Sequence, residues 1–297
     1  AWTNKASAEN LTDLERCKKE VFGDQIVEVG IAGSFQLAIQ YCTQAVESNE
    51  LSDPDMYHAL SARATAYATA GKYDLAIADF NRAIELDASR PAAFNGRGYA
   101  YDNKGMHDRA ILDYDEALRL DPNLALAYSN RGNALARKGM YDRAIADFDK
   151  AINLVSSYGS AYSNRGSAYY FKGDYGHAIA DFGMAIELNP ANALTYALRG
   201  AAIFNEGHFA KAIDDFAFAA MQDPADSYAA IWHYLAEERA GRNGLPWLSS
   251  AASRLELSSW PGPIVQIILG KTTVTEVADS VDRSEPNLRK GQKCEFN

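Results

Sequence analysis

Residues 125–157 read ALAYSNRGNALARKGMYDRAIADFDKAINLVSS, and stretches of the same pattern precede and follow them. One glycine marks the period, because it recurs every 34 residues, at Gly71, Gly105, Gly139, Gly173, Gly207 and Gly241. A fixed period of this length is typical of one helix–turn–helix unit stacked many times, since a single unit cannot bury its apolar face without its neighbours. The sequence therefore predicts an all-α solenoid of antiparallel helix pairs.

Five complete units cover residues 57–226 when they are aligned on these glycines. Each unit has a bulky residue at position 4, Gly or Ala at position 8, Ala at positions 20 and 27, and an aromatic residue at position 24. This pattern resembles the tetratricopeptide repeat (TPR) family. The resemblance implies a superhelical solenoid in which the first helix of each pair, helix A, lines a concave groove for a protein or peptide partner.

The periodic small and aromatic residues are predicted to form the core. Two helices approach to about 8–10 Å only where the contact residues are small. Helix A has Gly or Ala at position 8, and helix B has Ala at position 20, so these positions are expected to face each other where the two helices meet. Stacking requires an aromatic residue at the same helical phase of every unit, so we interpret position 24 as core and not as a cofactor pocket. These residues are Phe80, Tyr114, Phe148, Phe182 and Phe216.

Two series of opposite charge follow the same period. Arg occurs at position 7 of each unit, and Asp occurs 16 residues later. We expect a structural ladder of ion pairs between packed helices, in which each exposed pair is worth no more than ~1 kcal/mol; an anion-binding stripe is the alternative. The arginines are Arg63, Arg97, Arg131, Arg165 and Arg199, followed by His233 in the sixth unit, and the aspartates are Asp79, Asp113, Asp147, Asp181 and Asp215.

Both ends of the chain depart from the repeat and are predicted to cap it. Residues 1–56 are expected to form an N-terminal helical cap, an atypical helix pair, and residues 227–297 a sixth partial repeat and a C-terminal helical cap. A solenoid needs caps because its last apolar face must be covered. The C-terminal region is similar to that of NlpI-like periplasmic TPR proteins of bacteria. Its predicted cover consists of Trp247, Trp260, Ile264, Ile267, Ile268 and Leu269.

Two of the three cysteines are placed for a disulfide. Cys17 and Cys42 lie in two amphipathic stretches with Gly30 and Gly33 between them, so the two helices are expected to run antiparallel. Packed antiparallel helices can bring opposed Cα atoms within the roughly 7 Å that a disulfide needs. A Cys17–Cys42 disulfide is one interpretation, and two buried free thiols are the other. Cys294 is left without a partner.

Composition and motif content argue against several functions. The chain has 29 Lys and Arg residues against 39 Asp and Glu residues, a net charge of −10 and no basic run, so nucleic acid is not expected as a partner. No stretch approaches the ~18 apolar residues of a membrane-spanning helix. CxxC, HExxH, P-loop and GxSxG motifs do not occur, and the five histidines occupy five different phases of the repeat. We therefore expect no enzymatic activity, no cofactor and no metal site.

The candidate binding surface is the concave face of the A helices. With about 3.6 residues per turn, positions 5, 9 and 12 share a face next to the buried positions 4, 8 and 11. TPR domains that clamp a terminal carboxylate carry Lys or Arg at positions 5 and 9, and this chain has none there. Asn and Ser flanked by aromatic residues instead suit an extended or helical segment held by its main chain and apolar side chains. The predicted partner-binding residues are Tyr99, Asn133, Arg137 and Tyr170, together with Asn95, Asn103, Phe171 and Phe204.

These features predict a non-enzymatic scaffold or adaptor that binds a protein or peptide in its groove. The NlpI-like resemblance implies a bacterial protein with a periplasmic or secreted location and an envelope hydrolase or protease as its partner; a cytoplasmic location is the alternative. Two other interpretations stay open. One is a regulatory module of an enzyme whose catalytic part lies outside this chain, and the other is a self-assembling homo-oligomer such as a homodimer.

Overall fold

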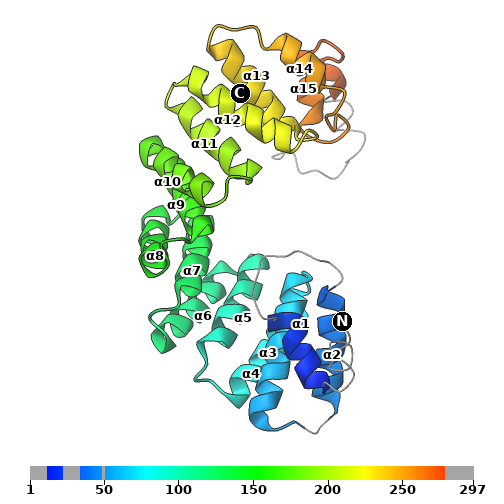
Figure 1. Cartoon of the computed structure of the whole chain (residues 1–297), viewed down its shortest axis with the longest axis vertical. Helices are drawn as coiled ribbons and strands as arrows, with labels where there is room; N and C mark the ends of the chain where they lie inside the picture. Colours follow the sequence, from blue (N-terminus) through cyan, green and yellow to red (C-terminus); the bar gives the residue numbers. More distant parts are fainter. Residues whose placement is uncertain (1–11, 23–33, 49–50, 278–297) are drawn as a thin grey trace, which may run out of the picture. The chain divides into compact units, whose positions relative to one another are not determined.

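The computed structural model describes residues 12–22, 34–48 and 51–277, and all regular structure in these ranges is α-helix (Figure 1). The predicted all-α fold is therefore confirmed. None of the helices in these ranges combines the length and apolar character that a bilayer span requires.

The chain divides into two compact units between Ala168 and Tyr169. The first unit contains α1 (Asp13–Phe22), α2 (Ser34–Glu47), α3 (Asp53–Thr69), α4 (Tyr73–Leu86), α5 (Pro91–Asn103), α6 (His107–Leu120), α7 (Ala125–Arg137), α8 (Tyr141–Leu154) and most of α9 (Gly159–Phe171). The second unit contains the end of α9, then α10 (Tyr175–Leu188), α11 (Ala193–Asn205), α12 (Phe209–Gln222), α13 (Ser227–Arg239), α14 (Leu245–Ala251) and α15 (Gly262–Ile268).

Within each unit, helices pack against their neighbours along the chain. In the first unit α1 pairs with α2, α3 with α4, α5 with α6, and α7 with α8, and the helices α2, α4 and α6 also contact the first helix of the following pair. In the second unit, α11 lies against both α10 and α12, and α12 also contacts α13. This nearest-neighbour packing is that of a repeat array.

The recurring glycine ends each helix A. At Gly105 the φ angle is +77°, the Gly105 amide donates to the Asp102 carbonyl at 2.9 Å, and the Met106 amide donates to the Tyr101 carbonyl at 2.9 Å. A Cβ atom at Gly105 would have nothing within 4 Å. Glycine is therefore required here for its left-handed conformation and not for lack of space. The same conformation, with φ from 73° to 89°, occurs at Gly71, Gly139, Gly173, Gly207 and Gly241.

The position-24 aromatic residues form the core, as predicted. A Cβ atom added at Gly98 would lie 2.8 Å from Cε1 of Tyr114, and one added at Gly132 would lie 2.8 Å from Cε1 of Phe148. The small residue of helix A therefore makes room for the aromatic ring of helix B in the same repeat. The aromatic side chains are at most 2% exposed at Phe80, Tyr114, Phe148, Phe182 and Phe216.

The Arg–Asp pairs are formed, but their carboxylates are buried. Arg97 donates from Nε and Nη2 to the two carboxylate oxygens of Asp113, at 2.8 and 2.7 Å, and Asp113 is only 7% exposed. The predicted ion pairs between packed helices are therefore present, and their aspartates are buried because position 23 of helix B lies against helix A of the same repeat. The same two-point contact joins Arg63 to Asp79, Arg131 to Asp147, and Arg199 to Asp215.

A third nitrogen of these arginines connects consecutive repeats. Nη1 of Arg97 donates to Oδ1 of Asn81 at 2.8 Å, and Nη1 of Arg131 donates to Oδ1 of Asp115 at 2.6 Å. Both acceptors belong to the preceding helix B. The positive charge of Arg97 and Arg131 is thus used inside the array, which supports the structural interpretation over an anion-binding stripe.

A disulfide between Cys17 and Cys42 joins α1 to α2, with the two Cα atoms 4.8 Å apart. Both cysteines are fully buried and contact Ala62 of α3. The structure thus contains the bridged alternative and not the two free thiols. The turn glycines Gly30 and Gly33, and the third cysteine, Cys294, lie outside the described residues.

The end of the second unit is covered by α14 and α15, as a cap should be. Leu248 of α14 and Val265 of α15 are fully buried against Ala230 of α13. Of the predicted cover residues, Trp247, Ile268 and Leu269 pack onto this cluster, while Ile264 and Ile267 are only partly buried. Trp260 is 53% exposed, so its predicted role as cover is wrong. Close to it in the chain, the Gly262 backbone packs against Leu257.

Candidate partner-binding face

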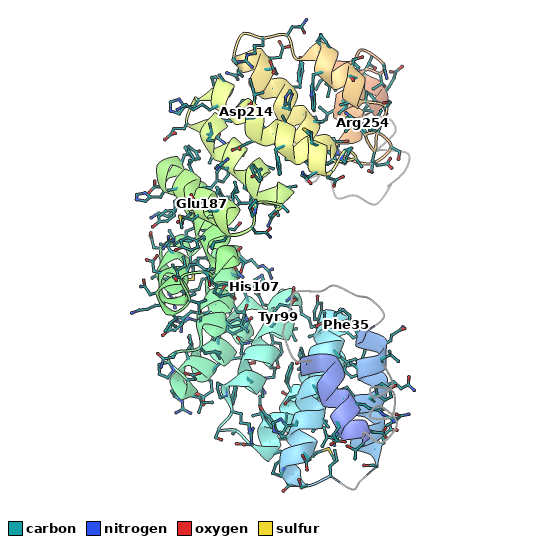
Figure 2. All side chains as sticks on the ribbon, in the orientation of Figure 1. Phe35, Tyr99, His107, Glu187, Asp214 and Arg254 are labelled. Atoms are coloured by element: carbon teal, nitrogen blue, oxygen red, sulfur yellow. A yellow bond between two sulfur atoms is a disulfide. The ribbon has the colours of Figure 1, made fainter. Side chains whose placement is uncertain are left out.

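Five of the predicted partner-binding residues, Asn95 among them, lie on α5 and α7, which are in contact in the first unit. Tyr99 and Asn103 are one turn apart on α5, and Asn133 and Arg137 are one turn apart on α7. Tyr99 is 43% exposed, and the Asn103 side chain donates from Nδ2 to the Tyr99 carbonyl at 2.9 Å. We call these four side chains the α5–α7 face; Figure 2 shows where Tyr99 lies.

Asn95 is placed differently from this face. Asn95 is only 8% exposed, and its Oδ1 accepts a hydrogen bond from Nδ2 of Asn130 at 3.1 Å. Ser129, which occupies the same repeat position on α7, is 3% exposed. Position 5 is therefore enclosed where adjacent A helices approach one another. Asn95 links two repeats and offers little surface to a partner.

A buried carboxylate fixes the orientation of Arg137. Asp102, in the last turn of α5, is 5% exposed. Its Oδ2 accepts from Nη1 of Arg137 at 2.8 Å, and its Oδ1 lies 2.6 Å from Nδ1 of His107 at the start of α6. The two oxygens of this carboxylate therefore contact nitrogens from two different helices. Arg137 is thus ion-paired with Asp102, although 49% of its side chain stays exposed.

Tyr114 lies beneath this cluster and responds to its charges. Burial raises the pKa of the Tyr114 hydroxyl, the Asp102 carboxylate raises it further, and the Arg137 guanidinium lowers it. The electrostatic interaction with Tyr99 also raises the pKa of the same hydroxyl. Tyr99, Asp102 and Arg137 therefore lie near one buried point. The hydroxyl of Tyr114 stays protonated at neutral pH.

Sequence reasoning missed His107 and gave Asp102 no role, although both depart from the repeat pattern. At position 17 His107 stands where the other four units have Tyr or Phe, and at position 24 Tyr114 stands where they have Phe. Asp102 is the only charged residue at position 12 of the five units. All three departures belong to the second repeat, which is the signal that would have found the cluster.

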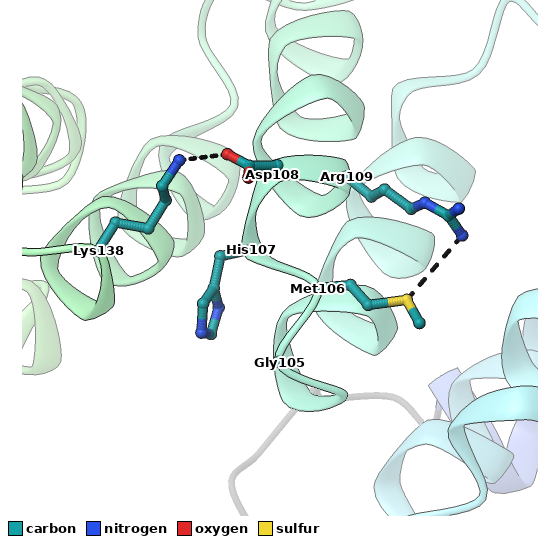
Figure 3. A pocket seen from close by; sticks show the side chains of 6 residues that line it. All are labelled: Gly105, Met106, His107, Asp108, Arg109 and Lys138. Carbon is teal, nitrogen blue, oxygen red and sulfur yellow. Dashed lines mark hydrogen bonds and ion pairs between the residues drawn. The ribbon is translucent and has the colours of Figure 1, made fainter.

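A pocket of about 350 Å³ lies at the start of α6, beside this cluster (Figure 3). Lys138 and Asp108 form an ion pair in its wall. Nη1 of Arg109 approaches the Met106 sulfur at 4.0 Å. Figure 3 shows Arg109 directed away from His107, so the basic side chains do not converge on one ligand position. The lining residues are Gly105, Met106, His107, Asp108, Arg109 and Lys138.

Tyr170 and Phe171, the predicted residues at the end of α9, belong to the second unit. The Tyr170 hydroxyl accepts a hydrogen bond from Nδ2 of Asn205 at 3.0 Å, and burial raises its pKa. The Tyr170 ring contacts those of Phe171 and Tyr175, each with centroids 5.6 Å apart. Phe171 is 66% exposed, so this pair presents a fixed Tyr beside an accessible Phe.

Phe204 contributes mainly to the interior of the second unit. Its ring packs edge-on against Trp232 at 5.3 Å and Phe209 at 4.9 Å between centroids. It also packs onto the cluster around Phe216. Phe204 is partly buried in this aromatic group, and it therefore offers less contact area than Phe171.

The site offers oriented donors and aromatic area. Among the described residues, no group of three or more His, Cys, Asp and Glu side chains is arranged to hold a metal ion. A His–Asp pair also occurs in hydrolytic triads, but Asp102 here also forms an ion pair with Arg137.

Family comparison places repeats on the helices that build this face. The profile described as TPR repeat matches residues 64–105, 103–139 and 132–173, and the profile described as tetratricopeptide repeat matches residues 159–192. No curated protein sequence matches the chain.

Several solved structures are similar in fold. PilF of Pseudomonas aeruginosa is 15% identical with a TM-score of 0.60, over 80% of this chain and 95% of that chain. YrrB, described as a TPR protein with an unusual peptide-binding site, is 24% identical with a TM-score of 0.54, over 65% of this chain and 98% of that chain. The Cut9–Hcn1 hetero-tetramer of the APC/C is 19% identical with a TM-score of 0.58, over 86% of this chain and 50% of that chain.

Proposed function

The chain is a tetratricopeptide repeat protein, and because arrays of this family are protein-interaction scaffolds, we propose that it binds a segment of a protein partner on the α5–α7 face. The observation that carries this proposal is that the contacting helices α5 and α7 present exposed Tyr99 and half-exposed Arg137, whose guanidinium is held by the buried Asp102. A side chain that is already oriented loses less conformational entropy on binding. Tyr and Arg are also the residues that most often dominate binding energy.

The neighbouring amides suit a main chain. Asn133 is partly exposed, and an Asn side chain can both donate to and accept from a peptide backbone. Asn103 uses one amide hydrogen on the Tyr99 carbonyl and keeps its carbonyl oxygen for a partner. Tyr99 then supplies rigid apolar area with a polar tip. Together these groups favour an extended segment held by its backbone and by one apolar side chain.

In the second unit, we propose Tyr170 and Phe171 as a further contact surface. Asn205 fixes the Tyr170 hydroxyl, while Phe171 remains accessible beside it. A fixed aromatic pair provides contact area at low entropic cost. Asn95 and Phe204 have smaller roles in this proposal because one is buried between repeats and the other packs in an aromatic cluster.

The proposed location is the bacterial periplasm or another extracytoplasmic compartment, and the proposed partner is an envelope hydrolase or protease. The support for the compartment is the Cys17–Cys42 disulfide, because disulfides persist mainly in oxidising environments. The support for the partner is the similarity of the C-terminal region to NlpI-like periplasmic proteins. We propose that the chain acts as a non-enzymatic adaptor for that partner.

The test begins with affinity purification from the envelope fraction of the cells of origin, followed by calorimetry with the purified partner. The Tyr99→Ala, Tyr170→Ala double variant should weaken binding by more than ~2 kcal/mol, about 30-fold in Kd. Its circular dichroism spectrum should match that of the parent. Each single variant then reports on its own unit.

The matched control is Leu112→Ala, because Leu112 is 68% exposed on helix B of the second repeat and away from the α5–α7 face. This variant should bind as the parent does. A double tyrosine variant that binds the partner with unchanged affinity would place the interaction on another surface. Recovery of further copies of this chain alone would favour the self-assembling alternative.

A further inference from the structure

Four arginines of the Arg–Asp pairs use the same edge of the guanidinium for a carboxylate. In Arg63, Arg97, Arg131 and Arg199, the Nε and Nη2 hydrogens point to the two oxygens of one Asp. Nη1 then contacts a second acceptor, as in Arg97 and Arg131. This two-point geometry matches the spacing of carboxylate oxygens and is the stronger form of the ion pair.

Arg137 uses the opposite arrangement. Its Nη1 donates to Asp102 at 2.8 Å, and its Nε and Nη2 donate to no group in the described part of the chain. The side chain is 49% exposed. The edge that every paired arginine above gives to a carboxylate is therefore open to a ligand, while the other end of the guanidinium is held in place by a buried group.

The charges around this open edge favour an acidic ligand. Positions 5, 9 and 13 of α3, α5 and α7 contain only one charged residue, Arg137, in a chain whose net charge is −10. The Asp102 carboxylate is buried and is in contact with both Arg137 and His107. An approaching carboxylate therefore meets a cation and neutral side chains on this face.

We propose that the segment bound by the α5–α7 face carries a carboxylate that pairs with Nε and Nη2 of Arg137. This inference rests on the proposed function of the same face and adds the chemical class of the partner. The carboxylate belongs to a Glu or Asp side chain or to a C-terminus, since both present the same pair of oxygens. Asp102 is the positioning residue, because it holds the guanidinium with its free edge outward.

The test uses three eight-residue peptides of Ala, Val and Tyr with an acetylated N-terminus. The first has one central Glu and an amidated C-terminus, the second has Gln in place of Glu, and the third has Gln and a free C-terminal carboxylate. Binding is followed by nuclear magnetic resonance at the Arg137 Nε–H group and the Tyr99 ring. We expect at least one carboxylate peptide to bind about tenfold more tightly than the neutral one.

Two variants and one control make the result specific. Arg137→Gln should abolish the preference for the carboxylate peptides, and Arg137→Lys should reduce it while keeping a cation beside Asp102, because an ammonium lacks the two-donor edge. Arg143→Gln is the matched control: Arg143 is exposed on the neighbouring α8, where its Nη1 approaches the Met140 sulfur at 4.0 Å. It should keep the preference of the parent.

The outcomes separate this inference from the proposed function. Equal binding of all three peptides, with Tyr99 signals that shift, overturns the carboxylate inference and leaves the binding face intact. A preference that survives in Arg137→Gln with an unchanged circular dichroism spectrum also overturns it. If no peptide shifts either the Tyr99 or the Arg137 signals, both the inference and the assignment of the face are rejected.

Discussion

Arg131 lies between two carboxylates from different repeats. Its Nε and Nη2 donate to Asp147 of its own repeat, both at 2.7 Å, and its Nη1 donates to Asp115 of the preceding repeat at 2.6 Å. Arg97 has the same two-point contact with Asp113, but its second acceptor is the neutral amide of Asn81. The two sites are therefore matched in geometry and differ in charge.

Removal of Asp113 should destabilise the fold more than removal of Asp147. The Asp113→Ala variant leaves Arg97 partly buried with no carboxylate partner, which typically costs about 3 kcal/mol. The Asp147→Ala variant leaves Arg131 paired with Asp115, so we expect the loss to be smaller by about 1 kcal/mol or more. Urea unfolding followed by circular dichroism measures both. Equal losses would show that Asp115 contributes nothing to the stability of its neighbour.

The position-8 glycines should tolerate no side chain. A Cβ atom at Gly132 would lie 2.8 Å from the ring of Phe148, so Gly132→Ala should cost about 1–3 kcal/mol through overpacking. Gly183, inside α10, has nothing within 4 Å of the same position, so Gly183→Ala should instead stabilise by about 0.5–1 kcal/mol. Thermal unfolding of the two variants should shift in opposite directions. A stabilised Gly132→Ala variant would contradict the packing described here.

The fold was predictable from the sequence because the same residue types recur at the same positions of each repeat. Gly105 and its counterparts end helix A, and Phe148 and its counterparts fill the contact between helices. The 34-residue period therefore predicted both the turns and the helix packing. The burial of Asp113 was less visible, since sequence spacing gives a helical face but not the depth of a side chain between two helices.

The candidate site was only partly predictable. Tyr99 and Arg137 follow from the helical face, but the Asp102–His107–Arg137 contacts join three helices and residues up to 35 positions apart. Such contacts depend on how adjacent A helices approach one another, and the sequence does not give that approach. The same approach of α5 and α7 encloses Asn95. Asp102 and His107 depart from the repeat pattern and so indicate where the site lies, but the pattern does not give their contacts with each other and with Arg137.

Loss of the Cys17–Cys42 disulfide should loosen the N-terminal helix pair. The cysteines are 25 residues apart in sequence, and closing a loop of that length is worth roughly 3–4 kcal/mol by the chain-entropy estimate. The Cys17→Ser, Cys42→Ser variant should therefore unfold at lower urea concentration, and hydrogen exchange should rise first in α1 and α2. Adding reductant to the parent protein should reproduce the effect. Identical unfolding with and without reductant would mean that the bridge does not stabilise these helices.

His233 should make the second unit less stable in mild acid. The residue is 4% exposed, its Nδ1 has no hydrogen-bond partner among the described residues, and its ring stacks on Trp247 with centroids 3.8 Å apart. Burial lowers its pKa, while the carboxylates of Glu237 and Asp214 act in the opposite direction. The unfolded chain, with an ordinary His pKa of about 6.5, therefore binds a proton before the folded chain does. Stability is complete above that pH and falls as the pH drops below it.

The melting temperature of the parent should decrease more steeply between pH 8 and pH 5 than that of His233→Phe, while the exposed-site control His208→Phe should keep the parental slope. Equal slopes for the parent and His233→Phe would show that protonation of this buried ring is not what weakens the unit.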